Sequence, residues 1–189
     1  MLMQENDASQ RTVGVDYTIA PNMAVAFHAQ EHTRGSPFVM LGPQLNLLLK
    51  RWNMEDGQGN IFTMTGAGAT LDRGDMRPAV WTGVLADYET RRIFLSYEGR
   101  LMYAKGVEKS AWQRARAGVA PYLGNYEDIN TWLMVQVDRY DEKHLSGHHV
   151  SSLPKTDVTP LVRLMYKTFL MEGGVSVHGK FMFNWIMQF

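Results

Sequence analysis

Apolar and polar side chains alternate along most of this chain, in short stretches separated by turn residues. Successive side chains of a β-strand point to opposite faces, so an alternation of period two predicts strands with one apolar face. The spacing of three to four residues that marks an amphipathic helix is nearly absent. We therefore expect about twelve strands, over residues 2–6, 11–19, 23–32, 38–52, 60–72, 79–89, 91–103, 112–123, 130–140, 158–167, 169–177 and 180–189.

The C-terminal stretch shows the alternation most clearly. One face of a strand over 180–189 carries large apolar side chains, namely Phe181, Phe183, Trp185, Met187 and Phe189. A carboxy-terminal Phe preceded by aromatic residues at alternate positions resembles the signal by which bacterial outer-membrane β-barrels are recognised and inserted. The resemblance implies that the barrel-assembly machinery is a partner, bound through the strand that ends at Phe189. Outer-membrane lipids and lipopolysaccharide are the other partners that it implies.

The connections between the expected strands also alternate. The tight ones are residues 20–22, 53–59, 90, 124–129 and 168, and longer ones such as 73–78, 104–111 and 141–157 lie between them. Short periplasmic turns and longer extracellular loops are typical of outer-membrane barrels. The expected fold is therefore a single all-β domain over residues 1–189, an antiparallel up-and-down transmembrane β-barrel whose termini both lie on the periplasmic rim.

The polar faces of the strands distinguish a barrel lumen from a solvated sheet. They carry equal numbers of acidic and basic residues mixed with glycines, which suits a narrow interior filled by ion pairs. The charged residues expected in the lumen are Asp16, Lys50, Asp87, Glu89, Glu98, Arg100, Arg114, Arg116, Asp138, Arg163, Lys167 and Glu172. The opposite faces are apolar, as a lipid-facing band requires, with Trp52, Tyr103, Trp132 and Tyr166 among the aromatic residues expected in girdles near strand ends.

Composition narrows the function and the location. Lys and Arg together number 19, as do Asp and Glu, so no net positive charge indicates a nucleic-acid partner. Cysteine is absent, which excludes disulfides, thiolate nucleophiles and cysteine-based metal sites. The first residues lack the basic start and apolar core of a signal peptide. An outer-membrane location in a Gram-negative bacterium therefore implies that the numbering begins on a processed or trimmed chain.

The expected function is a narrow or gated pore for ions or small solutes, because six charge pairs would obstruct much of a twelve-stranded lumen. A non-conducting structural or interaction barrel in an outer-membrane assembly is the alternative, with possible protein partners at the extracellular loops. A soluble β-barrel or sandwich binding protein is a further alternative, in which the apolar faces would form the core.

The histidines raise two further possibilities, an outer-membrane hydrolase and a metal site. His144, Ser146, His148 and His149 lie together in the longest expected loop, where no strand holds a base and an orienting acid in place. We therefore expect no enzyme activity and no cofactor. His144, His148 and His149, with nearby carboxylates, supply ligand types suited to zinc, copper or nickel, and they are the candidate metal site.

Overall fold

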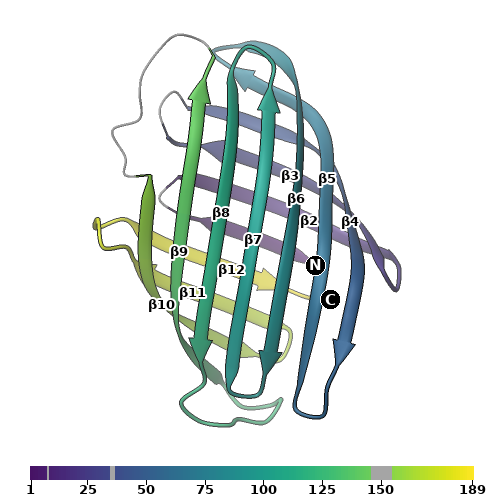
Figure 1. Ribbon diagram of the computed structural model, residues 1–189, viewed down its shortest axis with the longest axis vertical. Coiled ribbons are helices and arrows are strands. Elements are labelled where there is room, and N and C mark those ends of the chain that lie inside the picture. The colour runs from purple at the N-terminus through teal and green to yellow at the C-terminus, as the bar shows by residue number, and fades with distance from the viewer. Residues whose placement is uncertain (8, 35–36, 146–154) are drawn as a thin grey trace.

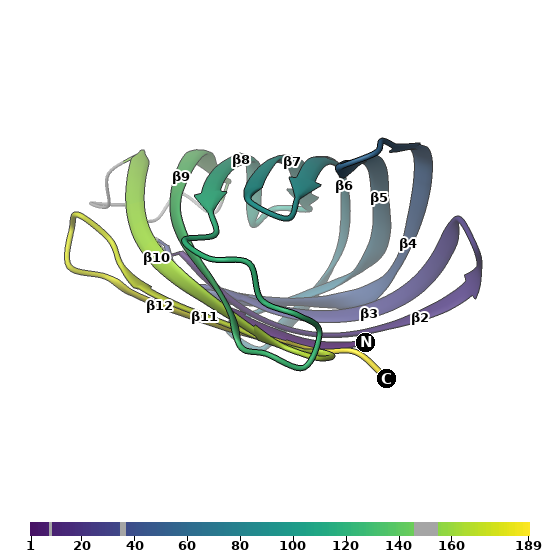
Figure 2. The ribbon, with the colours of Figure 1, turned by 90° about the horizontal axis from the view of Figure 1, so that it is seen from below.

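Twelve antiparallel strands form one closed barrel in the computed structural model of the chain, which describes residues 1–7, 9–34, 37–145 and 155–189. Seen from below, β2, β3, β11 and β12 lie along one side of the barrel and β5 to β9 along the other (Figure 1, Figure 2). The strands are β1 (Leu2–Asn6), β2 (Gln10–Ala20), β3 (Met23–His32), β4 (Phe38–Asn53), β5 (Gly57–Asp72), β6 (Asp75–Thr90), β7 (Ile93–Ala104), β8 (Glu108–Val119), β9 (Asn130–His144), β10 (Thr156–Tyr166), β11 (Phe169–Val175) and β12 (Phe181–Met187). The predicted all-β fold is confirmed.

Pairing between the first and last strands closes the barrel. Leu2 lies opposite Met187, and Asn6 lies opposite Phe183. Every strand thus has a hydrogen-bonded neighbour on both sides, which leaves no free sheet edge. Because the strands are even in number and antiparallel, both termini belong to one rim, here called the terminal rim, and the other is the distal rim. Across the described ranges, no helix has the length and apolar character that would carry it through a bilayer.

The lengths of the connections differ less between the rims than the sequence predicts. On the terminal rim, the β8–β9 connection takes up residues 120–129, although the alternation predicts a strand as far as 123. Pro121 follows the end of β8 at once and has no N–H to donate to the ladder. On the distal rim, only Arg73 and Gly74 join β5 to β6, with φ of 50° and 92°. Two central residues of positive φ form a tight hairpin turn, so this connection is not a long loop.

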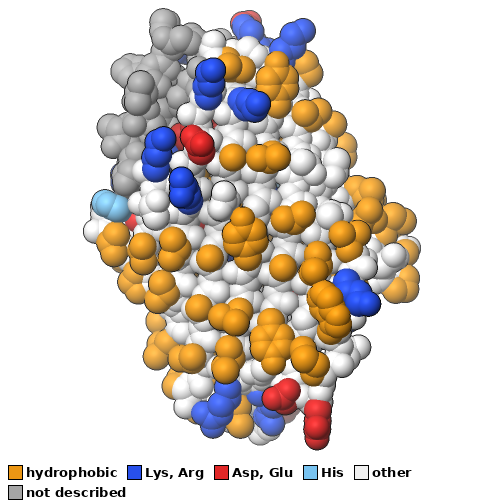
Figure 3. All heavy atoms as spheres, viewed as in Figure 1, with side chains coloured by type: hydrophobic (Ala, Val, Ile, Leu, Met, Phe, Trp, Pro, Cys, Tyr) orange, Lys and Arg blue, Asp and Glu red, His pale blue; other side chains and the backbone are white. Residues whose placement is uncertain are grey.

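The two faces of the barrel wall differ in chemistry. Outward positions are apolar and exposed, as at Val13, Leu101 and Leu133, whereas inward positions are buried and largely polar, as at Gln136 and Arg163. Figure 3 shows apolar side chains across the middle of one wall and charged side chains towards both ends. An apolar band outside and a polar interior are the arrangement that a barrel in lipid requires.

Two apolar clusters lie inside the barrel among the polar residues. One cluster contains Phe38, Met40, Ala79, Trp81, Met102, Ala104 and Val107, and the other contains Ala120, Trp132, Met134, Leu161 and Met182. Trp132 was predicted to lie in an outer girdle, and that prediction is wrong. Period two along β9 places Leu133 outside, so Trp132 faces inward, 5% exposed and edge-on to Phe94.

Two glycines bring the backbones of β4 and β5 unusually close on the inner face. Gly42 and Gly68 lie beside Pro43, where the proline cannot donate a ladder hydrogen bond. A Cβ built on Gly68 would lie 2.0 Å from the backbone oxygen of Leu41, and one on Gly42 would lie 2.5 Å from the backbone oxygen of Ala67. Neither strand accepts a side chain here unless its backbone moves.

Gly68→Ala is therefore expected to destabilise the barrel by roughly 1–3 kcal/mol, the usual cost of overpacking. Gly173→Ala is the control, because a Cβ on Gly173 meets nothing within 4 Å. The measurement is the temperature at which the detergent-resistant folded band converts to the unfolded band on a gel. Equal conversion temperatures for the two variants would contradict the close approach of β4 and β5.

Candidate functional site

The structure places most of the predicted lumen charges on the inner face of the barrel. The inward-facing members of the predicted set are Asp16 on β2, Asp87 and Glu89 on β6, Glu98 and Arg100 on β7, Arg114 and Arg116 on β8, Asp138 on β9, Arg163 on β10 and Glu172 on β11. Lys167 instead lies in the β10–β11 turn, with φ of 53°, where its Nζ is 3.6 Å from Glu127 Oε1.

Lys50 lies on the outer face, which corrects the prediction that it lines the lumen. The pairing of β4 with β5 shifts register between Leu48 and Lys50, and this bulge exchanges the faces of the residues that follow. Lys50 Nζ lies over the ring of Trp52, 5.9 Å from its centroid, and the lumen receives Arg51, whose Nε donates to Asn60 at 2.7 Å.

Arg114 lies at the centre of the interior charges. Its Nε donates to Asp138 Oδ1 at 2.8 Å, and its Nη2 donates to Asp7 Oδ2 at 2.6 Å. Glu5 Oε2 lies 4.0 Å from Nη1. The side chains of Arg114 and Asp138 are 3% and 4% exposed, so the guanidinium is out of water and these carboxylates compensate its buried charge.

A second set of ion pairs is centred on Glu172. Arg163 Nε donates to Glu172 Oε1 at 2.8 Å, and Arg163 Nη2 lies 2.8 Å from the same oxygen. Arg116 Nη1 lies 3.5 Å from Glu172 Oε2, and Asn184 donates to the same oxygen at 2.9 Å. Gln136 joins the two sets, since it accepts from Arg116 at 2.7 Å and donates to Asp138 at 2.5 Å. We call Asp7, Arg114, Asp138, Gln136, Arg116, Glu172 and Arg163 the cross-lumen network.

The contacts of the cross-lumen network are of two kinds. Arg114 and Asp138 are direct cross-strand partners, as are Arg163 and Glu172, so these pairs follow the wall and leave the lumen clear. The contact from Arg114 on β8 to Asp7, beyond the end of β1, spans the interior, and so does that from Arg116 on β8 to Glu172 on β11. Each spanning contact joins parts of the wall that are not neighbours in the sheet.

Aromatic rings support the guanidinium groups of the interior. The guanidinium carbons of Arg114 and Arg100 lie 4.5 Å and 5.5 Å from the Trp112 ring centroid. Arg163 lies 4.4 Å from the Phe94 ring centroid. Stacking on a ring adds attraction and holds each planar group in one orientation, which limits the positions that these side chains sample.

A hydrogen-bonded chain of neutral and acidic side chains runs along the inner face of the wall from β2 to β6. His28 Nε2 lies 3.2 Å from Asp16 Oδ1, and Asn46 donates to Asp16 Oδ2 at 3.1 Å. Gln44 donates to Asn46 at 2.7 Å and accepts from the indole of Trp81 at 2.8 Å. His28 is thus bonded within the wall.

The interior opens at the terminal rim into a vestibule of about 500 Å³. Asp56, Asp87, Glu89, Arg91 and Lys167 are the charged residues that line it. Figure 2 shows the β8–β9 connection running across part of the opening at this end of the barrel. It is tied on one side by the bond from Arg91 to the carbonyl of Gly124 at 3.5 Å, and on the other by the pair between Lys167 and Glu127.

Towards the distal rim the described interior is more tightly filled. An enclosed space of about 20 Å³ lies among Arg34, Trp112, Tyr140 and Glu142. Arg34 Nε is 2.6 Å from Glu142 Oε1, and its guanidinium stacks on Tyr140 at 4.5 Å. The vestibule therefore belongs to the terminal side, and the cross-lumen network lies beyond it.

The histidine cluster of the candidate metal site and hydrolase falls outside what the structure describes. Ser146, His148 and His149 are not among the described residues, and neither is the side chain of His144. Within residues 1–7, 9–34, 37–145 and 155–189, no group of three or more His, Asp and Glu residues could hold a metal ion. His178 does lie beside an acid, with Nδ1 2.9 Å from Asp157 Oδ1. Ser176 Oγ accepts from the backbone N–H groups of His178 and Lys180, so it caps the turn.

Sequence reasoning missed several members of the interior network. Asp7 lies in a connection and Glu5 on the shortest expected strand, where period two gives little signal. Gln136 and Asn184 are uncharged, so the charge pattern of the inner face does not include them. Arg51 lies after the bulge in β4, where the alternation predicts the wrong face. The inward parity of β9 and β12 could have indicated Gln136 and Asn184, because both lie between outward apolar residues.

Solved structures resemble this barrel along its whole length. LpxR from Salmonella typhimurium matches 100% of this chain and 99% of its own, with a TM-score of 0.52 and 8% identity. The KdgM porin in complex with oligogalacturonate matches 100% and 97%, with a TM-score of 0.54 and 11% identity. The NanC porin matches 100% and 98%, with a TM-score of 0.50 and 7% identity. The chain is a β-barrel of the outer-membrane type.

Sequence comparison adds no closer assignment for this outer-membrane-type barrel. No model of a protein family matches the chain, and no curated protein gives a significant match. Identities this low establish a shared fold. The features that distinguish this barrel therefore have to come from its own interior and its own outer wall.

Arg114→Met is expected to destabilise the barrel by about 3–5 kcal/mol, because Asp7 and Asp138 would stay buried without their cation. Arg139→Met is the control, since Arg139 is exposed on the outer face of β9 and forms no ion pair with any described residue. Urea unfolding in detergent, followed by tryptophan fluorescence, measures the difference. Equal unfolding midpoints would show that the Arg114 cluster does not stabilise the fold.

Proposed function

We propose that this protein is a narrow, gated pore of the Gram-negative outer membrane that passes ions or small solutes. The observation that supports the proposal is the cross-lumen network, two of whose contacts reach across the interior beyond the open vestibule. The two porins among the structural neighbours support a pore, and the outer-membrane location rests on the same likeness in fold.

The contact between Asp7 and Arg114 is the proposed gate. Asp7 lies in the β1–β2 connection, whereas Asp138, the other close partner of Arg114, belongs to the wall. Release of Asp7 would leave Arg114 paired with Asp138, so the lumen could widen without leaving a buried charge alone. Asp7 also accepts from the backbone N–H groups of Ser9 and Gln10 at 2.8 Å and 2.9 Å, which fixes the closed position of the connection.

The charges of the vestibule favour cations. Asp56, Asp87 and Glu89 line it with Arg91 and Lys167, and Lys167 is already paired with Glu127, which is outside the lining set. A mouth of net negative charge raises the local concentration of cations. The proposed pore is therefore cation-preferring.

Asp7→Asn is expected to raise the open fraction of the pore at least tenfold. A hydrogen bond to a charged group contributes about 1.5–3 kcal/mol, and 1.4 kcal/mol is a factor of ten in an equilibrium. Asp75→Asn is the control, because Asp75 lies in the exposed β5–β6 hairpin of the distal rim. Single-channel recording in planar bilayers measures the open fraction, and the reversal potential in a salt gradient should show cation preference.

Absence of current from both the native chain and Asp7→Asn, with folded protein verified in the same bilayers, would contradict the pore. That result would favour a non-conducting structural or interaction barrel, in which the network serves stability alone. The proposal assigns no catalytic role and no cofactor. The expected absence of enzyme activity and of a cofactor stays a prediction, as does the metal site at His144, His148 and His149.

The end of the chain is proposed to be the contact with the barrel-assembly machinery. Phe189 is 85% exposed just beyond β12, where the N–H of Gln188 donates to the carbonyl of Thr168 at 2.9 Å on the terminal rim. A free aromatic at the end of the closing strand is accessible to a protein that pairs with that strand.

Phe189→Ala is expected to lower the yield of folded barrel in the outer membrane severalfold without changing the stability of the barrel that does assemble. Phe181→Ala is the matched control, since Phe181 is 81% exposed at the other end of the same strand. Heat-modifiable mobility of membrane-extracted protein reports the folded yield. An equal loss of yield in both variants would contradict a terminal signal.

A further inference from the structure

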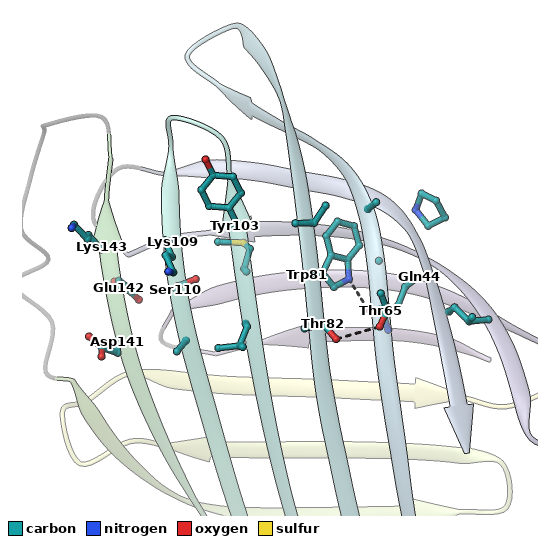
Figure 4. Close-up of a pocket in the computed structure, with 18 of the residues that line it drawn as sticks. Gln44, Thr65, Trp81, Thr82, Tyr103, Lys109, Ser110, Asp141, Glu142 and Lys143 are labelled. Atoms are coloured by element: carbon teal, nitrogen blue, oxygen red, sulfur yellow. Dashed lines mark hydrogen bonds between the residues drawn. The ribbon is translucent and has the colours of Figure 1, made fainter. Parts of the chain in front are cut away.

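A groove of about 970 Å³ runs across the outer face of the wall, on the opposite side of the strands from the lumen. Figure 4 shows Tyr103, Lys109 and Lys143 towards one end of it, and Thr65 and Thr82 towards the other. The lining is mainly apolar: Val25, Pro43, Leu45, Ala67, Val80 and Leu101 contribute to it. The hydroxyls of Thr65 and Thr82 lie 3.2 Å apart and satisfy each other, so the floor of the groove requires no polar partner.

The strand register explains the course of the groove. One row of cross-strand partners runs Ala67, Val80, Tyr103, Lys109 and Lys143 from β5 to β9. The adjacent row runs Val25, Leu45, Thr65, Thr82, Leu101, Ala111 and Asp141 from β3 to β9. Small side chains along these rows, at Ala67, Thr65, Thr82 and Ala111, leave the wall hollowed between larger neighbours.

The groove runs from membrane depth to the distal rim. Val25 belongs to β3, Leu45 is in the middle of β4, and Lys109 and Lys143 are next to the distal ends of β8 and β9. The longer row covers six strand spacings of about 4.8 Å, or roughly 29 Å. With strands tilted about 40°, a line across them climbs about 19 Å, slightly more than half of a hydrocarbon core of about 30 Å.

Uncompensated positive charge lies at the distal end of the groove. Lys109 and Lys143 are direct cross-strand partners and both are exposed, although like charges directly opposite each other destabilise a sheet. Neither forms an ion pair with a described residue. Asp141, the one acidic side chain of the adjacent row, lies 4.0 Å from Lys155, so the cluster of Lys109, Lys143, Lys155 and Asp141 keeps an excess of positive charge.

We propose that this groove is a binding site for a phosphorylated, multiply acylated glycolipid of the outer leaflet, the class to which lipid A belongs. Its phosphate lies between Lys109 and Lys143 and relieves their repulsion, while an acyl chain follows the apolar floor towards Leu45. The carboxylate of Asp141 stays turned towards Lys155. The site rests on the proposed outer-membrane location and is independent of pore function, because its residues belong to the outer face.

The size of the groove and its position favour this occupant over a protein segment. The apolar part descends about one leaflet from a cationic end, which matches a lipid whose charged head lies at the rim. A volume of about 970 Å³ lies at the upper end of the range for small-molecule sites, which suits more than one acyl chain.

Native mass spectrometry of the full chain in detergent, titrated with bisphosphorylated lipid A, tests the proposal. The double variant Lys109→Gln with Lys143→Gln is expected to weaken binding about 30-fold. Each lysine near an anionic membrane surface contributes about fivefold, and the two factors multiply. Arg92→Gln with Lys180→Gln removes the same charge from residues outside the groove and is expected to leave binding unchanged. Ala67→Phe fills the floor and is expected to weaken binding while both lysines remain. Every variant is first checked for heat-modifiable mobility.

Lipid A without phosphates should bind the native chain as weakly as bisphosphorylated lipid A binds the variant in which Lys109 and Lys143 are replaced. Equal binding by the native chain and that variant overturns the site. Equal retention of phosphatidylglycerol and lipid A overturns the choice of a glycolipid. Conductance is recorded in parallel, so loss of lipid binding with normal currents separates this inference from the pore.

Discussion

The absence of water in the hydrocarbon core of a membrane is the constraint on which this structure depends. Each backbone N–H and C=O at that depth needs a partner in the protein, and a sheet meets the need only when its edges join. Here the short β1 pairs with β12 on one side and β2 on the other. Five residues of β1 therefore close a sheet that would otherwise expose two unpaired strands to lipid.

Closure also determines what the interior has to contain. A twelve-stranded barrel encloses more space than an eight-stranded one, and lone side chains do not fill it. Arginine side chains are long, and they remain charged when carboxylates and aromatic faces surround them. The pairs between neighbouring strands stabilise the wall, whereas Arg114–Asp7 and Arg116–Glu172 extend across the space. Arg34 likewise reaches Glu142 across the distal part of the interior, and the two apolar clusters fill part of the remaining space.

The tilt of the strands relates the outer face to the bilayer. Cross-strand partners form rows perpendicular to the strands, so each row changes depth as it passes around the barrel. The row from Ala67 to Lys143 begins among lipid-facing apolar residues and ends among cations near the distal rim. Because the row changes depth, one groove has both an apolar floor and a charged end.

The alternation of apolar and polar residues, interrupted by turn residues, determines the main features of the fold from the sequence alone. Strand number, all-β class and the inward side of Arg114, Arg116, Asp138 and Glu172 follow from local patterns, because side-chain direction in a strand depends only on parity. Lys50 shows where parity fails, since one bulged residue in β4 exchanges the faces beyond it. The partnership of Arg114 with Asp7 and the juxtaposition of Lys109 with Lys143 required the tertiary structure. Register and closure set which distant residues meet, and these depend on hydrogen bonds between strands that no local pattern along the chain records.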